Sequence, residues 1–188
     1  TTGASNIGIG HEALGANTTG GENVAIGYGA LDASNASNNV AVGYLSLSAN
    51  TTGANNTGVG NNALGANTTG ASNTAVGKGA LDANTTAGNN VAVGQDALGS
   101  NTTGGQNTAL GLSALAANTT AANNVAVGYI ALLTNTTGSA NNAVGNEALR
   151  VNTTGSNNTG IGYNSMSANT TGADNAALGS QSLAANSS

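Results

Sequence analysis

The sequence lacks several residue types on which ordinary folds and sites depend. Its 188 residues include no Cys, Pro, Trp or Phe, and only 5% of them are charged. Without Cys there are no disulfides and no thiolate metal sites. Without Phe or Trp the apolar residues are mainly Ala, Val and Leu, so a conventional globular core is not expected.

Positive charge is scarce as well. Lys78 and Arg150 are the only Lys and Arg residues, against seven Asp and Glu, so the formal net charge is −5. Two cations cannot neutralise a run of phosphates, and we therefore exclude nucleic acid as a partner. The sequence has no apolar run of about 18 residues and no recognisable signal peptide. We expect no transmembrane segment, and an export signal, if one is used, lies outside this chain or has been removed.

The dominant feature is an internal repeat that spans the chain. Ten units have 17 residues and one has 16, and their consensus is T-T-G-x-x-N-V/T-A/G-V/I/L-G-x-x-A/S-L-x-A-N. We call each unit a coil, numbered 1 to 11, and each position in it a column, numbered from the first Thr. The coils begin at Thr1, Thr18, Asn35, Thr51, Thr68, Thr85, Thr102, Thr119, Thr136, Thr153 and Thr170.

Four columns hardly vary. Column six is always Asn, column eight is Ala or Gly, and column fourteen is Leu in every coil except at Met166. Column ten is always Gly, which suits a corner that needs positive φ or a close backbone approach. These predicted structural corners are Gly10, Gly27, Gly43, Gly60, Gly77, Gly94, Gly111, Gly128, Gly145, Gly162 and Gly179.

This period predicts an all-β fold, a parallel β-solenoid of eleven coils of 17 residues forming a single repeat array over residues 1–188. Asn-Val-Ala-Val-Gly is expected to form one short strand and x-x-Ala-Leu-x a second. The stricter aliphatic column nine is placed inside with the column-fourteen Leu, and column seven is expected to be only partly buried. The small residues of column eight would then let a neighbouring chain pack closely. Asn-Thr-Thr-Gly would form the other corner.

The motif at 39–43, 90–94 and 124–128 resembles the head repeats of trimeric autotransporter adhesins. The longer unit is similar to arrays in bacterial and phage tail-fibre proteins. The resemblance covers all eleven coils. It implies a left-handed parallel β-roll, three identical chains packed side by side, and a place at the surface of a cell or virion.

Little in the sequence points to catalysis, and we expect no enzyme activity, no metal and no cofactor. The only His, His11, lies in a variable column without a triad or a metal-ligand spacing. The seven acidic residues do not recur in register, as calcium-binding repeats would require, and solubility explains them better.

All four Tyr residues lie in column eleven, directly after the invariant Gly. They either form a surface strip that stacks against glycans or simply cover the corner. They are Tyr28, Tyr44, Tyr129 and Tyr163.

The end of each coil carries an N-x-S/T triplet, which is the acceptor pattern for N-linked glycosylation. Alternatively, Asn and Thr make a good turn with a hydrogen-bonded ladder, and the triplets follow from that. Where Ser34 replaces the Asn, the triplet at Asn35 restores an acceptor one residue later, which favours glycosylation. The candidate acceptors are Asn17, Asn35, Asn50, Asn67, Asn84, Asn101, Asn118, Asn135, Asn152, Asn169 and Asn186.

The sequence thus predicts a non-enzymatic structural or adhesive module of an extracellular surface adhesin or tail fibre, whose partners are copies of itself and a host or surface receptor. One alternative is the subunit of a head-to-tail filament, because neither terminal coil departs from the consensus as capping repeats do. Further alternatives are a glycan-binding solenoid or an ice-binding solenoid that uses the Thr pairs.

Overall fold

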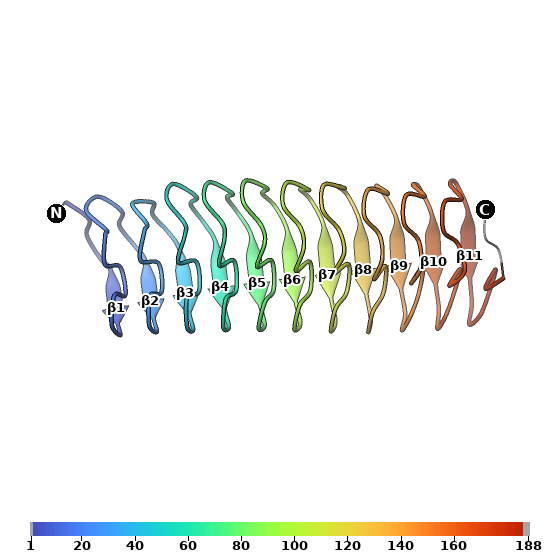
Figure 1. Ribbon diagram of the computed structural model, residues 1–188, viewed down its shortest axis with the longest axis horizontal. Helices are drawn as coiled ribbons and strands as arrows, with labels where there is room; N and C mark the ends of the chain where they lie inside the picture. The colour runs from blue at the N-terminus through green and yellow to red at the C-terminus, as the bar shows by residue number, and fades with distance from the viewer. Residues whose placement is uncertain (1, 186–188) are drawn as a thin grey trace.

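The chain forms one straight rod in the computed structural model, which describes residues 2–185 (Figure 1). Its eleven strands lie side by side in chain order in one parallel sheet. Each strand has three residues, and its neighbours are the equivalent residues of the preceding and following coils, as in Ala75 beside Ala92. This arrangement confirms the predicted parallel β-solenoid.

The strands have these bounds: β1 Ile7–Ile9, β2 Val24–Ile26, β3 Val40–Val42, β4 Thr57–Val59, β5 Thr74–Val76, β6 Val91–Val93, β7 Thr108–Leu110, β8 Val125–Val127, β9 Asn142–Val144, β10 Thr159–Ile161 and β11 Ala176–Leu178.

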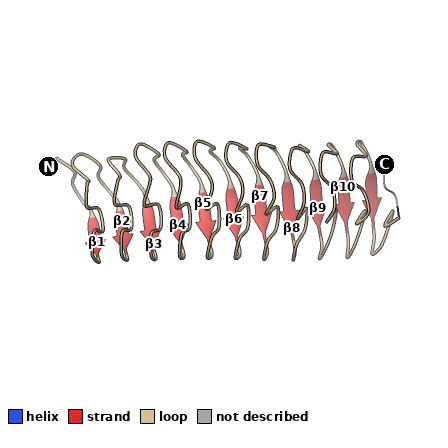
Figure 2. Ribbon diagram, in the orientation of Figure 1, coloured by secondary structure: helices blue, strands red, loops and turns tan. Residues whose placement is uncertain are grey.

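The predicted second strand is wrong. Figure 2 shows one row of strands along the rod, with turns and loops completing each coil, and residues 2–185 contain no helix. In coil 6 the Ala-Leu segment is a series of turns, in which amides donate to the carbonyl three residues earlier, as Ala97 does to Gly94 and Gly99 to Asp96. Asp96 and Leu98 have positive φ, at 55° and 53°. A residue with positive φ cannot continue a strand, so the segment turns instead.

The interior is lined by small side chains and one column of large ones. The column-fourteen residues, from Leu31 to Met166, are fully buried, as predicted. They pack with the Ala residues of columns eight and thirteen, such as Ala92 and Ala97. This cluster is the hydrophobic core of the rod.

The predicted inner face of the strand is wrong by one residue. Column eight points inward, and column nine points outward, with Val93 38% exposed and Ile161 39% exposed. A Cβ added at Gly160 would lie 3.3 Å from Cγ of Leu149, so the space opposite column fourteen holds little more than a methyl group. The small residues of column eight therefore fit the coil's own interior and do not serve to admit a neighbouring chain.

Candidate functional site

The column-seventeen asparagines form a ladder inside the rod. The side-chain amide of Asn67 donates to Oδ1 of Asn50, at 2.8 Å, and to the carbonyl of Gly70, at 3.0 Å. The same pair of bonds recurs in the following coils, and the asparagines from Asn50 to Asn169 are fully buried. Each amide nitrogen thus has both hydrogens engaged in the interior.

This ladder bears directly on the candidate glycosylation sites, because a glycan is attached through that same amide nitrogen. The folded coil leaves no room for a glycan at the buried positions, and a glycan added before folding would keep the coil from closing. Those positions are Asn50, Asn67, Asn84, Asn101, Asn118, Asn135, Asn152 and Asn169. Asn17 is half-buried and also donates to a backbone carbonyl. Asn186 lies outside the described residues.

Asn35 is the exposed member of the series, and the structure gives it a different role. Coil 3 is one residue short, and Oδ1 of Asn35 accepts hydrogen bonds from the backbone amide and hydroxyl of Thr18, at 2.8 and 2.9 Å. In other coils a backbone carbonyl accepts the equivalent bond, as Thr68 does from Thr51. The Asn35 side chain replaces the missing peptide carbonyl, while Ser34 Oγ accepts from the Asn50 amide in the ladder.

A second internal ladder is formed by the invariant asparagines of column six. Oδ1 of Asn73 accepts from the backbone amide of Asn90, and its side-chain amide donates to the carbonyl of Ala87. That carbonyl also accepts from Asn84 of the first ladder, so both ladders meet at column three. The sequence predicted a hydrogen-bonded ladder at the corner as the alternative to glycosylation, but it did not place the column-six asparagines inside the rod.

In coils 4 to 10 the hydroxyl of the first corner Thr donates a hydrogen bond to the next coil. The hydroxyl of Thr85 donates to the carbonyl of Thr102 at 3.1 Å, and Thr102 repeats this contact with Thr119 at 3.0 Å. A hydroxyl bonded between coils is less available to order surface water in a lattice. The second Thr of the pair, such as Thr69 or Thr86, stays exposed, so ice binding at this corner stays an alternative prediction.

The column-ten glycines follow each strand with φ between 119° and 139°. At Gly94 an added Cβ would clash with the backbone carbonyl of Gly111 in the next coil. Both the conformation and the close approach of neighbouring coils therefore require glycine at this corner.

The outer face of the sheet is an uncharged aliphatic strip. We define it as columns seven and nine, which hold the outward-facing first and last residues of β1 to β11. Column nine contains only Val, Ile and Leu, column seven contains Val, Ile, Thr, Ala and one Asn, and neither has a charged residue. Val76, Val93, Leu110 and Val144 are each 37–38% exposed. This aliphatic strip is the main apolar surface along the described part of the rod.

Column eleven places aromatic rings beside that strip, across the glycine corner. The rings of His11 and Tyr28 stack with centroids 5.2 Å apart, and those of Tyr28 and Tyr44 stack at 5.4 Å. Tyr129 and Tyr163 lie in the same column further along and are half exposed. The predicted Tyr strip thus divides into a stacked group in coils 1–3 and two separate rings in coils 8 and 10.

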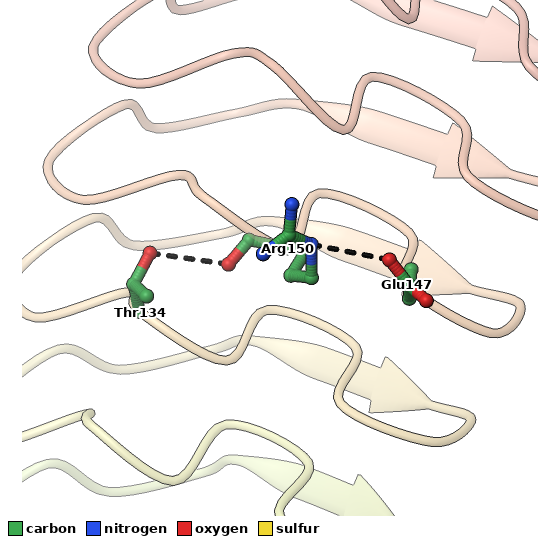
Figure 3. Close-up of polar contacts among 3 residues, drawn as sticks. All are labelled: Thr134, Glu147 and Arg150. Carbon is green, nitrogen blue, oxygen red and sulfur yellow. Dashed lines mark hydrogen bonds and ion pairs between the residues drawn. The ribbon is translucent and has the colours of Figure 1, made fainter.

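The few charged groups are dispersed. Nε of Arg150 forms an ion pair with Glu147 at 3.2 Å, and the Thr134 hydroxyl donates to the Arg150 carbonyl (Figure 3). Burial raises the pKa of the Asp82 carboxyl, and the Asp96 carboxylate raises it further.

Within residues 2–185, no three His, Asp or Glu side chains gather where they could hold a metal ion, and no helix is long and apolar enough to cross a membrane.

The motif resemblance to adhesin head repeats gains no support from known proteins and stays a prediction. A scan against protein families, a search of curated proteins and a search of solved structures each find no match to this chain.

Proposed function

We propose that this chain is a structural rod of an extracellular surface adhesin or tail fibre, and that it works as a homotrimer held together through the aliphatic strip. The observation that carries the proposal is this continuous, uncharged, outward-facing strip on a straight sheet. The motif resemblance supports the trimer and the surface location.

The size of the strip favours a protein partner. The strip is eleven strands long, at about 4.8 Å per strand, and two residues wide, at about 6.6 Å per residue of one face. Its footprint is therefore roughly 700 Å². Monomeric proteins rarely expose contiguous apolar patches above about 300–600 Å². A stable protein interface buries about 800 Å² on each partner. The strip, which includes four Thr and one Asn, is therefore at the upper end of what a monomer leaves open and close to what one interface needs. In a trimer the strip would face the three-fold axis and be shared between two neighbouring chains.

The repeat favours a second copy of the chain as that partner. Each coil presents the same outward columns at the same spacing, so identical rods can match side chains along their whole length. The net charge of −5 is carried by side chains outside columns seven and nine, so it does not oppose contact between strips. A closed assembly of this kind also hides apolar surface that would otherwise promote aggregation.

The test measures mass in solution and compares two pairs of charge substitutions in the same coils. Val76→Lys with Val93→Lys places two charges on the strip, whereas Thr69→Lys with Thr86→Lys places them on the exposed corner of coils 5 and 6. We expect the native chain and the corner variant to sediment near 3 × 17.7 = 53.1 kDa, and the strip variant to dissociate. Circular dichroism checks that both variants keep the native spectrum.

Three results would overturn the proposal. A native chain that stays at 17.7 kDa at all concentrations would show that the strip has no copy of itself as a partner. A strip variant that keeps the mass of the native chain would place the interface elsewhere. Long fibres of constant width in electron micrographs would favour the head-to-tail filament over a closed trimer.

A further inference from the structure

The stacked rings of coils 1–3 show how column eleven arranges its side chains. The Tyr28 ring lies between His11 and Tyr44, nearly parallel to both, with interplanar angles of 6° and 16°. One backbone hydrogen bond per coil sets this register, since Gly29 donates to the His11 carbonyl and Leu45 to the Tyr28 carbonyl, both at 2.9 Å. Column eleven thus holds flat rings one coil apart, face to face along the rod.

Coils 8–10 have the same register but lack the middle ring. The backbone amide of Glu147 donates to the Tyr129 carbonyl at 3.0 Å, and that of Asn164 donates to the Asn146 carbonyl at 2.9 Å. These bonds match those of coils 1–3 position for position. Asn146 therefore takes the place that Tyr28 has in the stack, between Tyr129 on one side and Tyr163 on the other.

From this shared register we expect Tyr129 and Tyr163 to flank a slot that is one ring thick. Across the complete stack the two centroid distances sum to 5.2 + 5.4 = 10.6 Å, with the Tyr28 ring filling the centre. Tyr129 and Tyr163 are likewise two coils apart, and their side chains are 50% and 51% exposed. The short Asn146 side chain at the base of the slot leaves open the outer part that a Tyr ring would fill.

We propose that Tyr129, Asn146 and Tyr163 form a binding slot for a neutral pyranose ring of a glycan. The two phenol faces would cover the two faces of the sugar, whose C–H groups are apolar, as aromatic rings do with other apolar partners. The Asn146 amide offers one acceptor and two donors to the hydroxyls on the edge of the sugar ring. A purely aromatic guest would form no hydrogen bond with this exposed amide, whereas sugar hydroxyls can, which favours a sugar over a second aromatic side chain.

The surroundings favour an uncharged sugar. Glu147 directly follows Asn146, and its carboxylate is held in the ion pair with Arg150, so the two charges largely offset each other (Figure 3). Arg150 is one of two cations in the chain, and the net charge is −5. An acidic sugar would thus be repelled by the rod as a whole and would find its nearest cation already paired.

The slot is separate from the surface that holds the rods together in the proposed function. The tyrosines lie in column eleven, and the aliphatic strip is in columns seven and nine, with the Gly corner between them. Sugar binding and self-association can therefore fail independently, and the mass of each variant is measured alongside its binding.

Nuclear magnetic resonance suits this test because the chain has four Tyr, one His, and no Phe or Trp, so only five aromatic rings need to be assigned. The native chain is titrated with neutral hexasaccharides, namely cellohexaose, laminarihexaose and chitohexaose. We expect at least one of them to shift the ring signals of Tyr129 and Tyr163 and to leave those of Tyr28 and Tyr44 unchanged. Removing either slot ring, by Tyr129→Ala or Tyr163→Ala, should weaken binding about five- to tenfold.

The decisive variant is Asn146→Tyr, which supplies the missing ring and fills the slot from within. It should abolish sugar binding while keeping the fold, the mass and the thermal midpoint of the native chain. The matched controls are Tyr28→Ala and Tyr44→Ala, which remove rings of the same column and should leave the dissociation constant unchanged.

Four outcomes would overturn the proposal. The first is that none of the hexasaccharides shifts the Tyr129 and Tyr163 signals up to millimolar concentration. The second and third are that Asn146→Tyr binds as tightly as the native chain, and that the control variants lose as much affinity as the slot variants. The fourth is that the slot binds phenol or indole and no sugar, which would make it a site for aromatic side chains instead.

Discussion

The two faces of the same short strand invert the usual relation between hydrophobicity and burial. The inward face carries Asn in column six and Ala or Gly in column eight, whereas the outward face carries mostly Val, Ile, Leu and Thr. The coil is so narrow that only the column-fourteen residue has room for a large side chain, and the remaining interior is closed by asparagine ladders. Volume and hydrogen bonding, more than apolar character, decide which residues lie inside.

The largest expected difference between the faces is for leucine. Leu98 is fully buried and Leu110 is 37% exposed on the outer face. Leu98→Ala leaves a cavity and should lower the free energy of unfolding by about 2–5 kcal/mol, whereas Leu110→Ala should lower it by less than about 1 kcal/mol. Both variants, and the two pairs that follow, are compared in the dissociated Val76→Lys/Val93→Lys background, where the strip faces water, and urea unfolding measures the two losses. Equal losses would contradict the assignment of column nine to the outer face.

Two neighbouring asparagines give the next comparison. Oδ1 of Asn141 accepts from the backbone amide of Asn158, and its side-chain amide donates to Gly155, whereas Asn142 points outward. Asn141→Ala leaves buried groups unpaired and should lower the free energy of unfolding by about 2–3 kcal/mol. Asn142→Ala should change it by less than about 0.5 kcal/mol. A harmless Asn141→Ala would show that the column-six ladder adds little to stability.

Enlarging an Ala side chain to Val should produce a smaller difference in the free energy of unfolding between the two faces. Ala92 is fully buried opposite the leucine column, and Ala176 is exposed on the outer face. Ala92→Val forces extra methyl groups into a packed interior and should lower the free energy of unfolding by about 1–3 kcal/mol. Ala176→Val should leave it within about 0.5 kcal/mol of the native value. Thermal unfolding followed by circular dichroism would show the difference, and a stabilising Ala92→Val would mean that the interior has unused space.

The smallest expected effect concerns pH and tests whether the Asp82 carboxyl, on the outer side of the coil, is partly buried. Burial and Asp96 raise the pKa of Asp82 in the folded chain, so the folded state binds a proton more readily than the unfolded state. Stability from this group is therefore full below the unfolded pKa and is lost as the pH rises through the folded pKa. Asp82→Asn should raise the thermal midpoint relative to the native chain more at pH 7 than at pH 3. A difference that does not change with pH would contradict this.

Much of the fold could be predicted because a strict 17-residue period permits few architectures. The solenoid, the parallel stacking and the buried column-fourteen Leu all follow from the period and the strand alternation. Alternation shows that columns seven and nine share one face and columns six, eight and ten the other, but it does not show which face is inside. The signal was present: columns six and ten do not vary and column eight is only Ala or Gly, and this strictness marked the inner face better than hydrophobicity did.

The candidate sites show the same limit. The N-x-S/T triplets are visible in the sequence, but only the coil geometry shows that most of their amides lie in a ladder inside the rod. Asn35, whose triplet favoured glycosylation, restores a hydrogen bond that the shorter coil would otherwise lose. The aromatic column was visible too, while the division into a filled stack and an open slot depends on which residues become neighbours across coils.

The sequence by itself determined the period, the corners that require glycine, the low charge and the number of coils, because each is a property of the repeat. The tertiary structure decided which strand face is buried, which asparagines are inaccessible and which tyrosines stack. These depend on the width of the coil and on contacts between residues about 17 positions apart. Such contacts exist only once the chain has wound, since the inside of each coil is enclosed by its neighbours.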